Sequence, residues 1–287
     1  MHSILLQFMK KLFFLAFGLS FMLCFAQRHE LGIFVGGANV VGDIGKDNFI
    51  NPLPVKIGDE GIFKNMPIAI GGIYRFNFNP HMGFRLMGTY ARVVGSDLVA
   101  NESYKKDRGY SYRNNIIEGA LLFEYNFFEI NNEYAYGDSH SPYIFGGFGG
   151  FMYDNLVYTV NHGFQKDENG VAIPNTLVST IESRPAKETK FTFPFGAGYK
   201  YKFRSGLVLS AEVGFRFTKT DNLDFSFADP SDFIFNAEPG LDPISIEEIN
   251  SNIIKSRQVG NTSSYDWYVF TGFTLTYSFG RPPCYCD

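Results

Sequence analysis

Residues 191–203 read Phe-Thr-Phe-Pro-Phe-Gly-Ala-Gly-Tyr-Lys-Tyr-Lys-Phe, and this stretch decides the fold of the chain. Bulky apolar or aromatic residues hold nearly every second position, and small or polar residues hold most of the positions between them. Such alternation is typical of a β-strand with one apolar and one polar face. Residues 207–218 and 266–279 repeat the pattern, so the two-faced strand recurs along the chain.

The apolar faces are too bulky to fill the inside of a small barrel. The chain contains 32 Phe and 17 Tyr in 287 residues. An eight-stranded barrel has an interior just wide enough to be filled by side chains. A soluble barrel would have to turn the bulky faces inward, whereas a barrel in a membrane turns them toward lipid. We therefore expect the polar faces to line the lumen and the apolar faces to contact lipid.

Eight segments carry the strand pattern, which predicts an all-β protein. An even number of antiparallel strands is usual for bacterial outer-membrane barrels. The approximate ranges of the predicted strands are 30–42, 67–79, 81–93, 111–129, 142–156, 189–204, 206–220 and 264–279.

Short and long connections alternate strictly between these strands. The short ones are a turn at Asn79-Pro80, residues 131–141 and a turn at residues 204–206. The long ones, rich in Asp, Asn, Gly, Pro and Lys, cover 43–66, 94–110, 157–188 and 221–263. With both termini in the periplasm, every short turn is periplasmic and every long loop is extracellular, as in outer-membrane barrels. The sequence thus predicts an eight-stranded antiparallel transmembrane β-barrel of the outer membrane.

The start of the chain predicts export. Lys10 and Lys11 precede an apolar run over residues 12–25, which a small residue and a polar segment follow. This arrangement is typical of a secretory signal peptide, and the run is too short for a membrane helix. The expected organisation is a signal peptide over 1–26 (with Met9 as an alternative start), a barrel over 27–280 and a periplasmic tail over 281–287.

Charge and cysteine content exclude several function classes. Residues 1–26 hold two Lys and no Asp or Glu, so the mature net charge is 23 − 29 = −6, which gives no reason to expect nucleic-acid binding. Lipid modification of Cys24 ranks below simple cleavage because the bulky Leu23 precedes it. Cys284 and Cys286 remain as two thiols on the tail, and the five histidines show no metal-ligand spacing. We expect no metal and no cofactor.

Charged residues recur on the polar strand faces. Isolated charges inside a barrel would be costly, so we expect them to pair with one another. We interpret them as a filling that closes the narrow lumen, with a conduction or proton path as the functional alternative. The predicted lumen charges are Arg75, Arg85, Glu118, Glu124, Lys200, Glu212 and Arg216.

No motif in the chain predicts catalysis. The glycine-rich residues 146–150 lie inside a predicted strand and open no helix, so they do not form a phosphate loop. Some small barrels are lipid-modifying enzymes with a His and a Ser at the outer rim, a role that would fall to His162 with Ser179 or Ser183. We rank that alternative low and predict that the protein is not an enzyme.

A short helix is expected in the last long loop. Asp242-Pro243 provides an N-terminal cap and a proline for the first turn, and Ile246, Ile249 and Ile253 follow at helical spacing. A helix with one apolar side at this place is expected to cover the mouth of the barrel.

Several segments resemble a known family. Gly36-Gly37-Ala38-Asn39-Val40-Val41-Gly42-Asp43-Ile44-Gly45 resembles the first strand and its exit in the PorG family, outer-membrane barrels of the type IX protein secretion system. The similarity continues in residues 118–127, 142–147 and 212–224 and ends with 266–272. Together these segments span nearly all of the mature chain.

The resemblance implies an accessory, structural role in the outer membrane. Proteins of the PorG family associate with the periplasmic ring of a lipoprotein and its partner, and the family has no catalytic residues to carry over. The partners implied are therefore outer-membrane lipids and that periplasmic ring. A passive structural barrel or small porin is the first alternative, and a lipid-modifying enzyme is the second.

A periplasmic partner would have little surface to contact, since two of the three inner turns are very short. The longer turn, 131–141, carries amphipathic aromatic residues of the kind enriched at interfaces, and the tail emerges on the same side. The candidate partner contacts are Asn132, Tyr134, Tyr136, Asp138 and Arg281.

Overall fold

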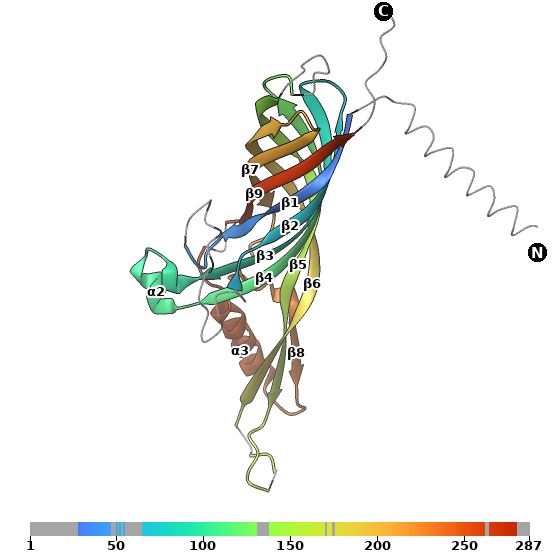
Figure 1. Cartoon of the computed structure of the whole chain (residues 1–287). Coiled ribbons are helices and arrows are strands. Elements are labelled where there is room, and N and C mark those ends of the chain that lie inside the picture. Colours follow the sequence, from blue (N-terminus) through green and yellow to red (C-terminus); the bar gives the residue numbers. More distant parts are fainter. Residues whose placement is uncertain are drawn as a thin grey trace, which may run out of the picture.

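Eight strands form a closed antiparallel ring (Figure 1). The ring consists of β1 (Arg28–Val41), β2 (Ala69–Asn77), β3 (Met82–Ser96), β4 (Ser111–Asn126), β5 (Ser139–Gly163), β6 (Val178–Lys202), β7 (Leu207–Thr218) and β9 (Trp267–Phe279). Each strand pairs with the next one in this list, so that β7 pairs with β9, and β1 closes the ring by pairing with β9 as well. The predicted eight-stranded antiparallel barrel is confirmed.

The computed structural model describes residues 28–46, 50, 52, 54, 65–130, 138–169, 171–173, 176–261 and 264–279. The predicted signal peptide and the predicted tail, including Cys284 and Cys286, lie outside these residues. Among the described residues, no helix is long and apolar enough to cross a membrane.

Two strands run far beyond the ring. β5 and β6 have 25 residues each and stay paired out to Gly163 and Val178, so they project as a hairpin below the barrel in Figure 1. The outer part of the connection 157–188 was expected to be an irregular loop, and that interpretation is wrong for residues 157–163 and 178–188. The strands continue because apolar side chains on one face of the hairpin find further partners outside the membrane.

Those partners complete a small outer lobe, which consists of residues 156–163 of β5, residues 178–188 of β6, β8 (Phe233–Ala237) and α3 (Pro243–Ser256). β8 pairs in parallel with β5, and the Phe233 ring stacks on Tyr158 at 4.9 Å. The core of the lobe contains Tyr158, Val160 and Phe233, together with Ala228 from the segment before β8, and Leu156, Ile181, Phe235, Ile253 and Ile254 pack against it.

Helix α3 begins as the sequence predicts. The Asp242 carboxylate accepts hydrogen bonds from the N–H groups of Ile244 (3.4 Å) and Ser245 (3.3 Å), and Pro243 lies in the first turn. The helix packs on the projecting hairpin through Ile253 and Ile254. Three shorter elements lie in the outer connections: η2 (Asp97–Val99) and α2 (Ser103–Arg108) between β3 and β4, and η3 (Pro230–Asp232) directly before β8.

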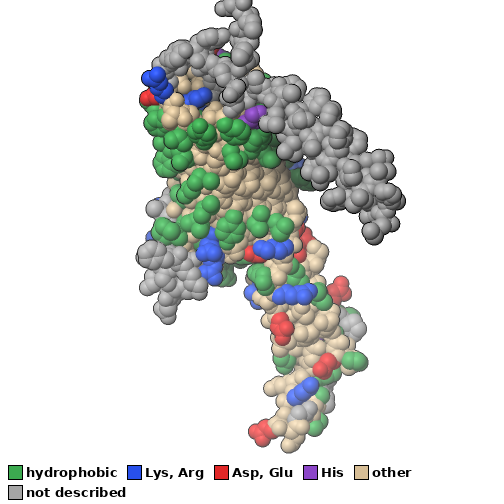
Figure 2. All heavy atoms as spheres, turned by 45° about the vertical axis from the view of Figure 1, so that its right-hand side comes forward, with side chains coloured by type: hydrophobic (Ala, Val, Ile, Leu, Met, Phe, Trp, Pro, Cys, Tyr) green, Lys and Arg blue, Asp and Glu red, His purple; other side chains and the backbone are tan. Residues whose placement is uncertain are grey.

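The two faces of the barrel wall differ as expected. Large hydrophobic side chains point outward from every strand of the ring and are widely exposed, Phe191 at 82% and Phe273 at 63%. Figure 2 shows these side chains over the barrel wall, with charged side chains below it and along the outer lobe. A surface of this kind is stable only in contact with lipid.

The interior is tightly filled. Tyr143 and Phe145 of β5 point inward and are almost fully buried. They lie against Gly198 and Gly196 of β6, where a Cβ atom would contact their rings; at Gly198 it would lie 2.7 Å from Cε1 of Tyr143. The small residues of β6 therefore make room for the large residues of β5.

Candidate functional site

The lumen is crossed by a network centred on Glu124. Its carboxylate lies 2.7 Å from Nε of Arg75, 3.1 Å from Nε of Arg85 and 2.5 Å from Nζ of Lys200. Arg85 also pairs with Glu212 at 2.6 Å, and the Tyr143 hydroxyl donates to the same Glu212 oxygen at 2.5 Å. The six strands from β2 to β7 are thereby joined through their inward side chains.

A second layer lies nearer the outer end. Arg216 Nε is 3.3 Å from Glu118 Oε2, and the Tyr268 hydroxyl donates to the same oxygen at 2.5 Å. The Arg216 guanidinium also lies over the Phe270 ring, 4.1 Å from its centroid. The structure therefore brings all seven predicted lumen charges inside the barrel and pairs each of them.

One member of the network was missed by the sequence analysis. Glu30 of β1 forms an ion pair with Arg75, and its carboxylate accepts hydrogen bonds from Asn77 Nδ2 at 2.8 Å and from Thr276 Oγ1 at 2.9 Å. The seven predicted residues comprised four cations and three anions, and that imbalance was a signal that a fourth carboxylate should face the lumen. With Glu30 the lumen network holds four of each sign, and every member is at most 4% exposed.

The arrangement can close the barrel but offers little for chemistry. The charged groups are held against one another and against aromatic rings that fill the cross-section. The paired charges and the rings together join the strands of the ring through the lumen.

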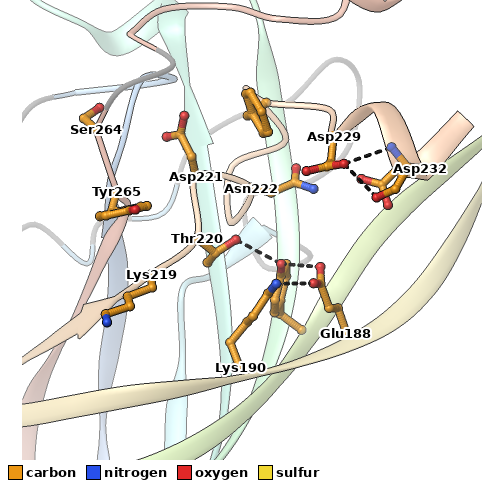
Figure 3. A pocket seen from close by; sticks show the side chains of 13 residues that line it. Glu188, Lys190, Lys219, Thr220, Asp221, Asn222, Asp229, Asp232, Ser264 and Tyr265 are labelled. Atoms are coloured by element: carbon orange, nitrogen blue, oxygen red, sulfur yellow. Dashed lines mark hydrogen bonds and ion pairs between the residues drawn. The ribbon is translucent and has the colours of Figure 1, made fainter.

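A polar pocket of about 330 Å³ opens at the outer mouth of the barrel, lined by residues of β5, β6 and the segments 219–232 and 264–265 (Figure 3). On one side, Glu188 pairs with Lys190 at 2.6 Å and accepts from the Tyr153 hydroxyl at 2.6 Å. Figure 3 shows the Asp221 side chain across the pocket from this ion pair. Asp221 is only 9% exposed, and neither of its carboxylate oxygens has a hydrogen-bond partner among the described residues.

Asp221 belongs to a group of four aspartates, which we call the acidic junction: Asp43 after β1, Asp221 and Asp224 after β7, and Asp266 before β9. Asp224 Oδ2 accepts from the N–H of Ile44 at 2.8 Å, and Asp266 Oδ2 accepts from the N–H of Leu223 at 2.9 Å. The junction thus joins the exits of β1 and β7 to the entry of β9 at one end of the barrel. Nothing in the sequence pattern of single strands indicated that these four residues meet.

The pKa values of all four carboxyl groups of the junction are raised above their ordinary values. Burial and the neighbouring Asp43 and Asp224 carboxylates raise the pKa of Asp221 to about 7. Burial, and then the charge of Asp224, raise the pKa of Asp266 well above its usual range. Burial is also the main cause that raises the pKa values of Asp43 and Asp224. Like charges gathered away from water disfavour one another's ionisation.

The residues of the enzyme alternative lie in the outer lobe. His162 Nδ1 is 2.8 Å from Ser179 Oγ and His162 Nε2 is 2.7 Å from Asn250 Oδ1, whereas Ser183 pairs with Tyr158 further along the hairpin. His162 is 2% exposed and its ring stacks on Phe235, and Ser179 does not line the neighbouring cavity. The contacts of His162 attach α3 to the hairpin, and we assign it this packing role.

Of the candidate periplasmic contacts, Asp138 lies within the described part of the chain, and Asn132, Tyr134, Tyr136 and Arg281 lie outside it. Asp138 is exposed at the start of β5 and accepts from the Tyr201 hydroxyl at 2.8 Å and from the N–H of Arg204 at 3.0 Å. The end of the longer periplasmic turn is therefore fastened to the short turn between β6 and β7.

A closed antiparallel ring of eight strands, apolar outside and charged inside, defines an outer-membrane β-barrel, and the protein spans the outer membrane. Within this class, the chain belongs to the family described as a domain of unknown function, DUF6089, whose model matches residues 9–185 and 241–287. The comparison with curated proteins found no match.

Solved structures of other barrels are similar to this chain at low identity. The N-terminal β-barrel domain of OprF from Pseudomonas aeruginosa is 11% identical, with 87% of this chain and 97% of that chain covered and a TM-score of 0.35. The Yersinia pestis attachment invasion locus protein Ail, in complex with the heparin analogue sucrose octasulfate, is 12% identical, with 88% and 99% covered and a TM-score of 0.34. The structure of Ail in a phospholipid bilayer nanodisc gives 12% identity, 87% and 99% coverage and a TM-score of 0.32.

Proposed function

We propose that the protein is a non-enzymatic, non-conducting structural barrel that serves the type IX protein secretion machinery as an accessory component of the outer membrane. One observation carries the structural part of the proposal: the lumen network fills the barrel with paired charges and aromatic rings. A barrel that is closed inside must act through its surfaces. The link to secretion rests on the resemblance of residues 36–45 and 212–224 to the PorG family.

The proposed partner is the periplasmic ring of that machinery, formed by a lipoprotein and its partner. On the periplasmic side, the turns 78–81 and 203–206 are tight, with backbone hydrogen bonds from Phe78 to Met82 (3.2 Å) and from Phe203 to Leu207 (2.8 Å). The turn between β4 and β5 is longer and offers more surface. Asp138, at the end of this turn, is attached to the turn between β6 and β7, which supports Asp138 as a contact residue because a residue already held in place loses less entropy on binding.

Co-purification tests this proposal. Extraction of the tagged protein in mild detergent is expected to recover a periplasmic lipoprotein and its partner, identified by mass spectrometry. Replacement of residues 132–137 by a Gly-Ser segment of equal length and the variant Asp138→Asn should lower this recovery while the barrel still inserts. Truncation after Gly280 tests the tail. Equal recovery by all three variants would show that the contact lies elsewhere, and recovery of no periplasmic partner by the parent would contradict the secretion role.

The passive-porin alternative is distinguished by conductance. The parent protein reconstituted in a planar bilayer is expected to show no stable channel currents, because paired charges and aromatic rings occupy the narrow lumen. Stable single-channel steps from the parent would favour the porin alternative.

A further inference from the structure

The segments that the sequence analysis singled out as most specific meet at one place, and the proposed function does not use it. Asp43 lies in the segment 36–45, Asp221 and Asp224 lie in 212–224, and Asp266 opens 266–272. The structure gathers all four carboxylates in the acidic junction at the extracellular end of the barrel. A buried group of like charges is costly unless something of opposite charge offsets it.

The space at the junction is shaped for carboxylates. Gly42 lies between two of them: a Cβ atom on this residue would come closer than 3.0 Å to Asp266 Oδ1 and to Asp224 Oδ2. A side chain at position 42 would therefore push apart two oxygens that the fold brings to the same spot.

Protein cations offset only part of this charge. Lys105 and Arg108 of α2 face Asp43, but Arg108 is paired with Asp97 at 2.7 Å and the Lys105 ammonium donates to the Gly45 carbonyl at 3.2 Å. Backbone N–H groups serve one oxygen each of Asp43 and Asp266. The carboxylate of Asp221 has no hydrogen-bond partner among the described residues although the residue is 91% buried, so this carboxylate is the group left to receive a ligand.

We propose that the acidic junction binds a partly hydrated divalent cation, Ca²⁺ or Mg²⁺, with Asp221 as the ligand reached from the outer mouth pocket. Carboxylate oxygens are the ligands that these ions prefer, and both ions can keep several water molecules in a protein site. Among the described residues, no group of three or more His, Cys, Asp or Glu side chains is placed to hold a metal ion by direct contact alone, so water would have to supply part of the coordination at the junction. The proposal is independent of the role in secretion.

The ion would fasten the outer lobe to the barrel. Asp221 and Asp224 lie just after β7 and Asp266 just before β9, so they stand at the two ends of the segment that carries β8 and α3. Asp43 adds the exit of β1. A cation bridging these ends would hold the base of the lobe at the rim, in an extracellular setting where sites of millimolar to submillimolar affinity are filled.

The chain offers a spectroscopic probe of this site. Trp267 is the only tryptophan of the 287 residues and follows Asp266 directly. Terbium, which replaces Ca²⁺ at oxygen sites, should therefore emit when Trp267 of the refolded barrel is excited, and added Ca²⁺ should quench that emission. Thermal unfolding in detergent at pH 8 gives a second readout, with a higher midpoint in Ca²⁺ than in chelator.

The deciding comparison is between Asp221→Asn and Asp229→Asn, which remove the same charge from the same pocket. Asp229 caps η3 through Ser231, and an asparagine can keep that cap. We expect Asp221→Asn to weaken terbium and Ca²⁺ binding at least tenfold and to lose the Ca²⁺-dependent rise in midpoint, while Asp229→Asn behaves like the parent. Absence of saturable terbium and Ca²⁺ binding by the parent, or equal binding by Asp221→Asn, would overturn the proposal whatever the stability of the variants.

Discussion

Arg75 and Glu124 meet at the centre of the lumen, where Nε of the arginine lies 2.7 Å from Oε2 of the glutamate. The Glu124 carboxylate also forms ion pairs with Arg85 and Lys200. Removing its carboxylate would leave three buried cations with fewer anions than they need. We expect Glu124→Ala to lower the free energy of unfolding by about 3–5 kcal/mol, the usual cost of breaking a buried ion pair. Urea unfolding of the refolded barrel in detergent measures this change.

Glu182→Ala, on the exposed outer part of β6, is the matched control for that measurement and should change stability by less than about 1 kcal/mol. If Glu124→Ala is as stable as this control, the lumen network contributes nothing to the fold and its sealing role loses its physical basis.

A substitution at Phe215 tests which side chains of β7 point toward lipid and which point into the lumen. Glu212 and Arg216 point into the lumen and are buried, while Phe215 lies on the outer face and stacks on Phe195 at 5.6 Å. An arginine on the lipid face costs about 2–4 kcal/mol near the midplane. Phe215→Arg should therefore reduce folding into lipid vesicles, whereas Tyr104→Arg on the exposed helix α2 should not. Normal folding of Phe215→Arg would show that this face does not contact lipid.

The fit between β5 and β6 predicts a difference between two glycines. A Cβ atom on Gly198 would lie 2.7 Å from Tyr143 Cε1, whereas a Cβ atom on Gly119 would have no neighbour within 4 Å. Gly198→Ala should destabilise the barrel by about 1–3 kcal/mol through overpacking, and Gly119→Ala should be tolerated. The shift of the folded band on unheated gels, followed against urea, measures both. Equal stability of the two variants would mean that the interior is not close-packed there.

The acidic junction predicts a pH dependence in the presence of chelator. The pKa of Asp221 is raised to about 7 in the folded protein, so the protonated carboxyl stabilises the fold. That contribution is complete at pH values below the unfolded pKa, about 4, and is lost as the pH rises through 7. Asp221→Asn cannot ionise, so it should unfold at higher urea than the parent at pH 8 and at the same urea near pH 4. A difference that does not change between these pH values would contradict the assignment.

His162 should matter for the outer lobe and not for the barrel. Its ring bridges Ser179 of β6 and Asn250 of α3. His162→Ala removes two hydrogen bonds, each worth about 1 kcal/mol. We expect faster hydrogen exchange and proteolysis in residues 243–256 with unchanged unfolding of the barrel, while Lys166→Ala on the lobe surface leaves both unchanged. A loss of any lipid-directed hydrolysis in the same variant would instead support the enzyme alternative.

Most of the ring could be predicted from the sequence, because a wall with lipid on one side and charges on the other imposes a strict period of two. The predicted ends agree with the observed ones to within three residues, except at the outer ends of β5 and β6. The outer ends of β5 and β6 were predicted too short because strands were expected to be only as long as the membrane is thick. Beyond it, Tyr158 and Val160 are buried by β8 and α3, which lie more than 70 residues further along the chain.

Of the candidate sites, those that depend on the pattern of a single strand could be predicted, and those that depend on contacts between distant segments could not. The lumen charges were visible because each one lies at an inward position of its own strand. Glu30 escaped notice because the polar residues after the signal peptide were interpreted only as its boundary. The acidic junction could not be predicted, because Asp43, Asp221 and Asp266 are brought together by ring closure and not by any local pattern.

The pairing of β1 with β9 also has a consequence for how the chain folds. The Glu30 carboxylate accepts a hydrogen bond from Thr276 across this seam between β1 and β9. The paired residues of the seam are separated in sequence by almost the whole described chain. Contacts so distant in sequence form late. Until the seam forms and Glu30 takes its place, the interior would hold four cations and three anions. The charges of the interior are therefore balanced only when the ring is closed. Closure of the ring and the correct register between β1 and β9 are thus expected to form together, in one cooperative event.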